Sequence, residues 1–600
     1  MDILAFDQNR IEIKPFGAIP SGSELVFRIQ LQSSDVPASF FLSISLEGGP
    51  NWRIPGIFHE DQKQCDFPWK AEIIGLYFIH VEAGDGMESG QIVSNTEQVT
   101  VYRDCFETPD WMKHGVMYQI FPDRFAKSKF YQAPPMTKNH RLRSDWGGTP
   151  DHGPDENGIV WNKDFFGGNL KGIEEGLPYL QELGVTVIYL NPIFEAFSNH
   201  RYDTGNYKKI DPLLGTEADF CDLCQSAKQR GIRIILDGVF SHTGSDSLYF
   251  NKEGSYPETG AYQSRNSPYY NWYTFQQYPD HYDCWWGIKT LPNVDELEPS
   301  YLDYILREED SVVKHWLRCG ASGFRLDVAD ELPDDFLDEM RIAVKSVDQD
   351  AAIIGEVWED ASNKISYGYR RRYLQGDQLD SVMNYPWKDA IIRYLTVDWD
   401  GVGLSKRIES IWKNYPKPAF RSLMNIVGTH DTARILTVLS GNPPNYELGR
   451  QRLFLALLLW AFLPGIPCIY YGDEIGMEGE QDPFNRRCFD PDHAKLEILQ
   501  FYKRILQFRK NIPSLGDLEF KPLAAHGGYY AFERNLRGSG DRLIVAVNAG
   551  MYGEHLALNL NADEKIADFV ISGDVRFSSK NEFSLAGNSG IAVHLKVTPT

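Results

Sequence analysis

The chain has 600 residues, a formal net charge of -23 and a pI near 5.1, so it lacks the basic surface that a nucleic-acid partner requires. Its hydrophobic content of 42% and charged content of 24% are typical of globular proteins, and no apolar run of about 18 residues predicts a membrane span. A chain of this length exceeds one hydrophobic core, so several domains are expected.

The N-terminal part is predicted to form a β domain. Met1-Asp2-Ile3-Leu4 lacks a basic region followed by an apolar one, which favours a cytoplasmic protein unless a signal peptide has been removed. Short strand-like runs separated by Gly, Pro, Ser and Asp predict a β-sandwich over residues 1–104, with an accessory carbohydrate-binding or dimerising role. These runs cover residues 25–32, 40–46, 72–82 and 98–102.

Residues 112–514 show a different pattern, in which apolar runs alternate with amphipathic helical segments. Apolar strands covered by helices indicate a parallel sheet of the α/β class, and eight such units indicate a closed (β/α)8 TIM barrel. The expected strands are residues 116–121, 185–190, 232–236, 323–326, 351–355, 380–383, 422–427 and 466–471. Helices are expected at residues 170–183, 217–230, 301–319, 333–347, 447–462 and 495–509.

Two segments lie outside this alternation. A polar and aromatic insertion, an inserted B domain over residues 243–298, follows the third expected strand. Its aromatic residues at 269–273 and 285–286 fit either a cover over a cleft or a small local core, and the sequence leaves both open. Beyond residue 514 the strand-like runs return, which predicts a C-terminal β-sandwich over residues 515–600.

The eight cysteines are scattered through the chain and do not resemble a disulfide framework. Cys221 and Cys224 form a C-x-x-C pair, but within a helical segment and without a second Cys/His pair nearby in the sequence. Zinc or redox use is therefore not predicted, and buried small apolar side chains are the favoured interpretation.

Charged side chains recur where the expected barrel strands end. In such a barrel the active residues lie at the carboxyl ends of the strands and in the loops that follow them. One acid alone could cap a helix, but four acids at the same end of a barrel would destabilise it by charge repulsion, so their presence together indicates a function. The set comprises Asp237 and His242 after strand 3, Arg325 and Asp327 on strand 4, Glu356 after strand 5, and His430 and Asp431 after strand 7.

Paired carboxyl groups of this kind suit retaining glycoside hydrolysis, in which one acts as nucleophile and the other as acid/base. A metal-dependent hydrolase would instead require convergent ligand motifs such as H-x-H or H-E-x-x-H. His200, His242 and His430 stand beside aromatic or acidic residues and in no such motif, so they fit hydrogen bonds to sugar hydroxyls better.

The four strand-end segments resemble the hallmark regions of the α-amylase family of glycoside hydrolases, from about residue 115 to the end of the chain. Within the family the chain is most similar to the neopullulanase, cyclomaltodextrinase and maltogenic amylase group. That narrower resemblance rests on the N-terminal β domain and on three motifs. These are His200-Arg201-Tyr202-Asp203-Thr204, Leu291-Pro292-Asn293-Val294-Asp295 and Gly472-Asp473-Glu474-Ile475-Gly476-Met477.

The resemblance implies a role for each candidate residue. Asp327 would be the nucleophile, Glu356 the general acid/base and Asp431 the third catalytic carboxylate. Arg325 would keep Asp327 ionised, and Asp237 would support the cluster. The remaining substrate-binding positions implied are His200, Tyr202, His242 and His430 around the cleaved sugar, Glu331 on the acceptor side, and the pair Asp482 and Arg486 on the donor side.

The resemblance leaves calcium open and implies no required cofactor. Many relatives carry Asn before the strand-3 histidine as a calcium ligand, and here this residue is Ser241. Asn169 likewise replaces the Asp of a Gly-Gly-Asp-Leu motif. No metal ligand is therefore predicted.

The resemblance implies hydrolysis of α-1,4 bonds in maltooligosaccharides, cyclodextrins, pullulan or starch, with transfer to sugar acceptors as a side reaction. A 4-α-glucanotransferase or an α-1,6-acting pullulanase-type enzyme is the alternative. A barrel that binds carbohydrate without catalysis is the non-enzyme alternative, and the presence of Asp327, Glu356 and Asp431 argues against it. The resemblance also implies a homodimer, for which no residue of the chain argues directly.

Overall fold

The computed structural model describes residues 11–30, 39–84, 91–134, 140–156, 158, 160–396, 398–536, 538–561, 564–579 and 581–597. The chain forms two compact units. The first comprises Met1–Thr108, Glu359–Asp380 and Ile408–Phe420, and the second comprises Pro109–Trp358, Ser381–Arg407 and Arg421–Thr600. The predicted domain boundaries stay predictions, and Met1–Leu4, on which the cytoplasmic location was based, lies outside the described residues.

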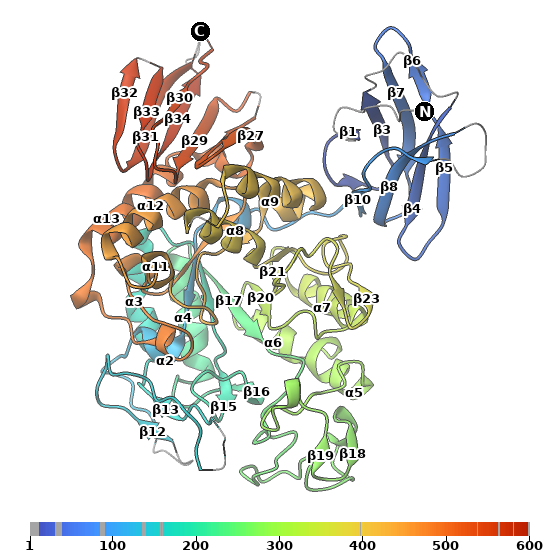
Figure 1. Ribbon diagram of the computed structural model, residues 1–600. Helices are drawn as coiled ribbons and strands as arrows, with labels where there is room; N and C mark the ends of the chain where they lie inside the picture. Colours follow the sequence, from blue (N-terminus) through green and yellow to red (C-terminus); the bar gives the residue numbers. More distant parts are fainter. Residues whose placement is uncertain are drawn as a thin grey trace. The chain divides into compact units, whose positions relative to one another are not determined.

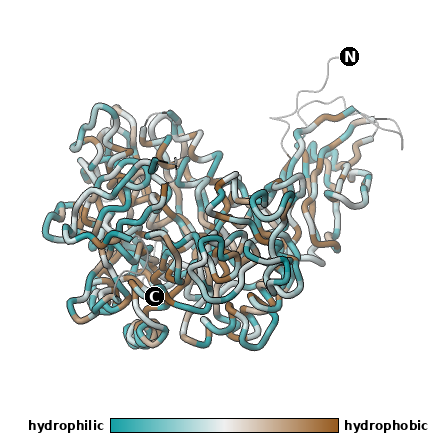
Figure 2. The backbone as a smooth tube through the Cα atoms, turned by 90° about the horizontal axis from the view of Figure 1, so that it is seen from below, coloured by the Kyte–Doolittle hydropathy of each residue, from teal (hydrophilic) through white to brown (hydrophobic). Residues whose placement is uncertain are grey.

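The first unit contains two facing sheets, in the strand orders β1-β3-β7-β6 and β2-β10-β8-β4-β5, with β9 paired to β8. Alternate residues of each sheet point inward and share one core, in which Phe27 and Phe67 of one sheet and Ile44 and Ile79 of the other are buried. In Figure 2 apolar stretches run along these strands. The strands are β1 Glu12–Lys14, β2 Ile19–Pro20, β3 Ser23–Gln30, β4 Phe40–Leu46, β5 Asn51–Pro55, β6 Ile57–His59, β7 Gln64–Ala71, β8 Gly75–Ala83, β9 Gln91–Ile92 and β10 Glu97–Tyr102.

The second unit contains an eight-stranded parallel sheet in the order β24-β21-β20-β17-β14-β11-β26-β25. A parallel bridge between Met383 and Met424 joins the two ends and closes the barrel. Figure 1 shows its helices around these strands. The strands, each at a predicted position, are β11 Met117–Ile120, β14 Val187–Leu190, β17 Arg233–Gly238, β20 Gly323–Leu326, β21 Ala352–Gly355, β24 Ser381–Val382, β25 Met424–Asn425 and β26 Ile466–Tyr470. The predicted fold class is confirmed.

The barrel helices begin and end at recognisable signals. The Asn169 side chain caps the start of α3, and Gly184, with a φ of 93°, ends it in the left-handed conformation that glycine adopts without strain. The helices are α3 Leu170–Leu183, α4 Glu217–Gln229, α6 Val312–Arg318, α7 Asp334–Val347, α8 Tyr385–Leu395, α9 Gly401–Asn414, α11 Ile435–Ser440, α12 Tyr446–Phe462 and α13 Leu496–Lys510.

The single helix predicted over residues 301–319 is wrong. The segment is broken into α5 (Pro299–Leu302), a π-helical turn (Asp303–Arg307) and α6. Glu308 leaves the helical region with a ψ of 153°, and the Ser311 hydroxyl donates to the Leu306 carbonyl and so satisfies a backbone acceptor at the break. Apolar periodicity continues through this break, which is why the sequence pattern does not reveal it.

The C-terminal strands form two sheets, in the orders β27-β28-β29-β34-β31 and β30-β33-β32. They contact α12 and α13 (Figure 1). Because α12 lies between these strands and the barrel, nearly all of its second half is buried, which explains its apolar sequence. The strands are β27 Glu519–His526, β28 Tyr529–Asn535, β29 Asp541–Asn548, β30 Glu554–Ala557, β31 Glu564–Ser572, β32 Val575–Ser579, β33 Glu582–Leu585 and β34 Ser589–Val597.

Among the described residues, none of the helices has both the length and the apolar composition needed to cross a bilayer.

Candidate active site

Three strand ends meet at the guanidinium of Arg325, which is fully buried on β20. Its Nη1 donates to Oδ1 of Asp237 and to Oδ1 of Asp327, each across 2.8 Å. Its Nη2 lies 2.6 Å from Oε2 of Glu356, an ion pair outside hydrogen-bond geometry. Strands β17, β20 and β21 therefore deliver three carboxyl groups to one cation.

Burial and mutual repulsion dominate the charge balance of this cluster. Burial raises the pKa of Asp327 well above its usual range, Arg325 opposes the rise, and the neighbouring carboxyls of Glu356, Asp237 and Asp431 add to it. Burial likewise raises the pKa of Asp237 and of Asp431. Burial thus favours the protonated forms of these three acids, and the charge of Arg325 favours their ionised forms.

The Glu356 side chain is held by two donors besides Arg325. The backbone N–H of Val328 donates to Oε2 and the indole N–H of Trp358 donates to Oε1, both across 2.9 Å. The Trp358 ring stacks on Tyr385 with the centroids 4.1 Å apart. The carboxyl group is therefore fixed in one orientation before any substrate arrives.

A second network joins Tyr202 and His430. The Gln119 amide donates to Nδ1 of His430 across 2.9 Å, so Nε2 is assigned the ring proton and lies 2.6 Å from the Tyr202 oxygen. The Tyr202 hydroxyl in turn donates to Oδ2 of Asp237 across 2.8 Å. The two rings are parallel, with an interplanar angle of 5°. The chain of donors thus leads to the Arg325 cluster.

The three candidate histidines are neutral at neutral pH. Burial lowers the pKa of His200 and of His430 well below the usual value, and it lowers the pKa of His242 to about 4. Nδ1 of His200 is 3.0 Å from the Ser198 hydroxyl, and Nδ1 of His242 is 3.0 Å from the Ser241 hydroxyl. Neutral imidazoles can bind hydroxyl groups without adding charge to the site.

Asp431 is the most accessible of the cluster acids, with 29% of its side chain exposed. Its Oδ1 accepts from Nη2 of Arg486 across 3.3 Å, and its Oδ2 lies 3.1 Å from Nε2 of His430. Arg486 also pairs with Asp482 across 2.9 Å. Arg486 therefore connects the predicted donor-side pair to the third predicted carboxylate.

The aromatic insertion divides into a core and an edge. Trp272 and Tyr273 are buried among Tyr249, Phe250 and Tyr301, so the first aromatic stretch is a local core. The second stretch lies near the site, where Trp285 is 5.7 Å from His242 between ring centroids, and the exposed Trp286 stacks on Trp285. The Trp286 indole donates to Oε1 of Glu331 across 3.3 Å.

The sequence profile described as "Alpha amylase, catalytic domain" matches residues 119–500, which is more than half of the chain. The chain belongs to the α-amylase family. Every strand-end acid of the cluster lies inside the matched segment, and so does the insertion that carries Trp286.

Relatives within this family include an amylopullulanase from Thermoanaerobacterium saccharolyticum, 37% identical over 91% of this chain and 48% of that protein. The chain thus spans about half the length of that relative. It is also 35% identical to the intracellular maltogenic amylase of Bacillus subtilis, over 78% of this chain and 74% of that protein. The type III pullulan hydrolase from Thermococcus kodakarensis has a similar structure, with a TM-score of 0.70, 26% identity and coverage of 98% of this chain and all of that one. The predicted similarity to the neopullulanase, cyclomaltodextrinase and maltogenic amylase group is confirmed.

The structure brings all twelve predicted site residues into the second unit. Ten of them form one set linked by hydrogen bonds and ion pairs, and His242 and Glu331 lie at its edge beside Trp285 and Trp286 respectively. Their individual roles stay predictions. Four residues that support the set were missed: Gln119, Tyr189, Asn191 and Trp358. Tyr189 donates to Oδ2 of Asp237 across 2.6 Å, and Asn191 donates to the Tyr202 oxygen across 2.8 Å. Of these four, Asn191 had an available signal in the sequence, because it is a polar residue directly after a barrel strand.

The positions where relatives carry calcium ligands do not fit the ion here. Oδ1 of Asn169 already accepts the backbone N–H of Gly172 across 2.8 Å as the cap of α3. The Ser241 hydroxyl pairs with His242, as described above. These oxygens are committed to internal hydrogen bonds, and a hard cation requires six or more oxygen ligands.

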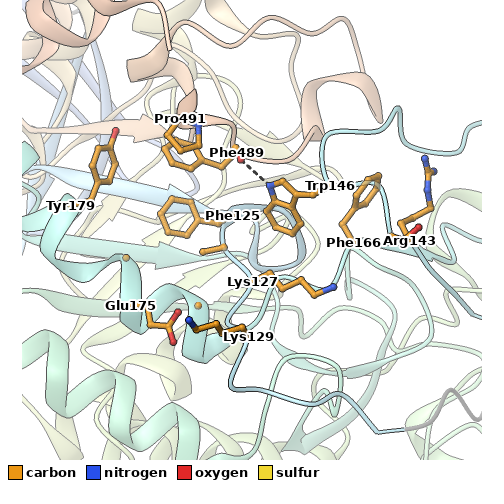
Figure 3. Close-up of a pocket in the computed structure, with 14 residues that line it drawn as sticks. Phe125, Lys127, Lys129, Arg143, Trp146, Phe166, Glu175, Tyr179, Phe489 and Pro491 are labelled. Carbon is orange, nitrogen blue, oxygen red and sulfur yellow. Dashed lines mark hydrogen bonds between the residues drawn. The ribbon is translucent and has the colours of Figure 1, made fainter. Parts of the chain in front are cut away.

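A cavity of about 720 Å³ lies elsewhere in the second unit, beside α2 (Pro122–Phe125) and α3. Figure 3 shows Phe125 and Trp146 among its lining residues, with the Trp146 indole donating to the Phe489 carbonyl. None of the predicted site residues lines this cavity. It lacks a paired-carboxyl arrangement, so the cluster around Arg325, and not the cavity, is the candidate active site.

Proposed function

We propose that the protein is a retaining α-glucan hydrolase that cleaves α-1,4-glucosidic bonds through a covalent glycosyl-enzyme intermediate. The observation that carries this proposal is the shared guanidinium of Arg325, which keeps the carboxyl groups of Asp327 and Glu356 close together. Retaining glycosidases hold their two carboxyl groups about 5–5.5 Å apart, whereas inverting enzymes need room for a water between them.

In the first step, an oxygen of Asp327 attacks the anomeric carbon while the glycosidic oxygen leaves with the proton of Glu356. In the second step, water gives a proton to Glu356 and its oxygen to the same carbon, which releases Asp327. Arg325 stabilises the carboxylate of Asp327 whenever the covalent bond is absent. Asp431 and the neutral His430 are available to hydrogen-bond sugar hydroxyls as the ring distorts.

Maltooligosaccharides, cyclodextrins, pullulan and starch are the proposed substrates. Pullulan is the first to test, because the names of two similar proteins mention it. Panose as product supports α-1,4 cleavage. Maltotriose would assign the chain to α-1,6 cleavage, and longer oligosaccharides formed from maltotriose would assign it to glucan transfer. A lack of turnover on all four substrates would support a non-catalytic carbohydrate-binding barrel.

The decisive experiment compares Asp327→Asn with Asp335→Asn, an exposed acid in the first turn of α7. The first variant should lose roughly 10⁴-fold or more in kcat and the second should keep full activity. NMR of the first product should show the α-anomer, as retention requires. Full turnover by Asp327→Asn, or a β-anomeric first product, would overturn the proposal.

We also propose that no cofactor is required, because the candidate calcium positions are occupied by internal hydrogen bonds. The test adds Ca²⁺ to chelator-treated protein and measures activity and Tm. Neither quantity should change. A rise in both with Ca²⁺ would show that a calcium site exists.

We further propose a homodimer that acts in the cytoplasm. Support comes from the family resemblance and from the similarity to the intracellular maltogenic amylase. Light scattering of the purified chain should give twice the monomer mass, and activity should remain in the cytosolic fraction of the native cell. A monomer mass would contradict the proposed dimer, and activity in the secreted fraction would contradict the proposed location in the cytoplasm.

A further inference from the structure

Two barrel helices, labelled α4 and α6 in Figure 1, carry side chains of metal-ligating types that contact each other. On α4, Glu217 and Cys221 are four residues apart, and on the α6 side His315 and Cys319 have the same spacing. Residues four apart lie on the same face of a helix. The sequence has no Cys/His pair near Cys221 and Cys224, but in the folded protein His315 and Cys319 of the neighbouring helix lie beside them.

Donor atoms of three residues converge between the helices. Nε2 of His315 is 3.1 Å from Oε2 of Glu217 and 3.8 Å from Sγ of Cys319. Sγ of Cys319 is 3.9 Å from Oε1 of Glu217. Among the described residues, this is the one group of three such side chains whose donor atoms all lie within 4.8 Å of one another.

The helices approach closely enough to hold this geometry. A Cβ on Gly320, directly after Cys319, would lie 2.7 Å from Cβ of Cys224, so only glycine permits the contact. The thiol of Cys221 also interacts with that of Cys319 and is a candidate fourth donor. Behind the cluster, Nδ1 of His315 lies 3.6 Å from Oδ1 of Asp310, an ion-pair distance that is longer than a hydrogen bond.

We propose that Glu217, His315 and Cys319 form a zinc site that links α4 to α6, with Cys221 or water as the fourth ligand. Tetrahedral zinc has metal–ligand bonds of about 2.0–2.3 Å, which places its donor atoms roughly 3.3–3.8 Å apart. The three separations in the structure, 3.1, 3.8 and 3.9 Å, lie within a few tenths of an ångström of this range, so only small side-chain shifts are needed to bind the ion. The mixture of thiolate, imidazole and carboxylate suits zinc better than calcium or magnesium, which prefer oxygen ligands alone.

The metal would replace a proton. A cysteine thiol is largely protonated at neutral pH, and it binds zinc as the thiolate. Zinc binding releases that proton, and the affinity should therefore increase with pH.

The site would serve stability and not chemistry. Helix α4 leads into β17, which carries Asp237, and α6 leads into β20, which carries Arg325. A metal that joins the two helices constrains the strands that supply the centre of the carboxylate cluster, without contact to the reacting atoms.

The test uses the full-length protein. Metal-free protein is dialysed against micromolar zinc, and bound zinc is measured by mass spectrometry alongside Tm. Cobalt is the second probe, because tetrahedral cobalt–thiolate binding gives visible and near-ultraviolet absorption. We expect one zinc per chain, a Tm raised by several degrees and the cobalt–thiolate bands.

The matched variants are Cys319→Ser and His315→Gln, with Cys105→Ser as the control, since Cys105 is an exposed cysteine of the other unit. Each ligand variant should weaken zinc binding roughly 100-fold and abolish the Tm rise, and the control should behave as the wild type. The proposal is overturned if zinc stays substoichiometric, if Cys319→Ser binds zinc normally, or if thiol titration shows a Cys221–Cys319 disulfide in purified protein. Activity at moderate temperature should be equal in all variants.

Discussion

The backbone N–H of Val328 donates to Oε2 of Glu356 across 2.9 Å, while Val328 itself has a φ of +37°. This left-handed conformation is rare for a β-branched residue and costs about 1–3 kcal/mol. Val328 directly follows Asp327, so one strained residue sets the path of the chain after the predicted nucleophile and orients the predicted acid/base. The strain is thus located between the two groups that must cooperate.

The first prediction concerns this strain. Val328→Gly retains the N–H and tolerates the positive φ, so we expect activity within about twofold and a Tm close to that of the wild type. Val328→Pro lacks the donor and cannot adopt the conformation, so kcat should fall by roughly 100-fold or more. Kinetics and thermal unfolding of both variants provide the measurement.

Val344→Gly is the control, because Val344 is buried in the regular helix α7. There the same substitution should cost roughly 3 kcal/mol through the lost packing and the poor helix propensity of glycine. Equal destabilisation at positions 328 and 344 would show that the Val328 conformation carries no strain of consequence.

The second prediction separates acid catalysis from nucleophilic attack. In Glu356→Gln the single amide oxygen can accept from only one of the two donors, Val328 or Trp358, and no proton reaches the leaving group. Turnover of pullulan should fall by about 10²–10⁴-fold, whereas release of fluoride from α-maltosyl fluoride should fall far less, because fluoride leaves without protonation. Equal losses on both substrates would assign Glu356 a role other than acid.

The third prediction concerns stability at low pH. Burial lowers the pKa of His242 to about 4, whereas in the unfolded chain it is near 6.5. Between these two pH values the unfolded state binds a proton that the folded state does not. The free energy of unfolding therefore increases with pH across this window, and the stability contributed by the neutral His242 disappears as the pH falls. The full difference corresponds to about 3 kcal/mol. The raised pKa values of Asp327, Asp237 and Asp431 act in the opposite direction, because those acids bind protons more tightly in the folded state.

Comparing the wild type with His242→Asn isolates the histidine. Urea unfolding at pH 4.5 and pH 7.5 should show a smaller loss of stability on acidification in the variant than in the wild type. Substitution of His493, a largely exposed histidine between β26 and α13, should leave the pH dependence unchanged. An identical loss in the wild type and His242→Asn would rule out His242 as a source of the acid sensitivity.

The strand-end residues could be predicted because parallel barrel strands converge at their carboxyl ends whatever the loops do. Arg325 and Asp327 therefore stand beside Asp237 and Glu356 as a consequence of strand register alone. Tyr189 and Gln119 could not be distinguished from core residues, because their strands are buried on both faces and the sequence does not show which side chains reach the mouth.

Backbone conformation and exposure also escaped prediction. The positive φ of Val328 follows from tertiary contacts, since valine has no intrinsic preference for it. The two aromatic stretches of the insertion have similar composition, yet Trp272 is 2% exposed and Trp286 is 77% exposed. Burial depends on what the loop packs against, and composition does not specify that.

The fourth prediction concerns Trp286. Its indole stacks on Trp285 with centroids 5.0 Å apart, and its N–H reaches Glu331 on the predicted acceptor side. This exposed ring is stacked on Trp285, which in turn lies near His242, and it offers a face on which a sugar can stack. Such contacts contribute about 0.5–1.5 kcal/mol. In Trp286→Ala we expect KM for maltooligosaccharides to rise roughly threefold to tenfold, transfer to sugar acceptors to fall relative to hydrolysis, and Tm to stay nearly constant.

Tyr552→Ala, which removes an equally exposed ring from the C-terminal sheets, is the control and should change none of these. An unchanged KM and transfer ratio in Trp286→Ala would show that the pair of tryptophans only shields the insertion from water.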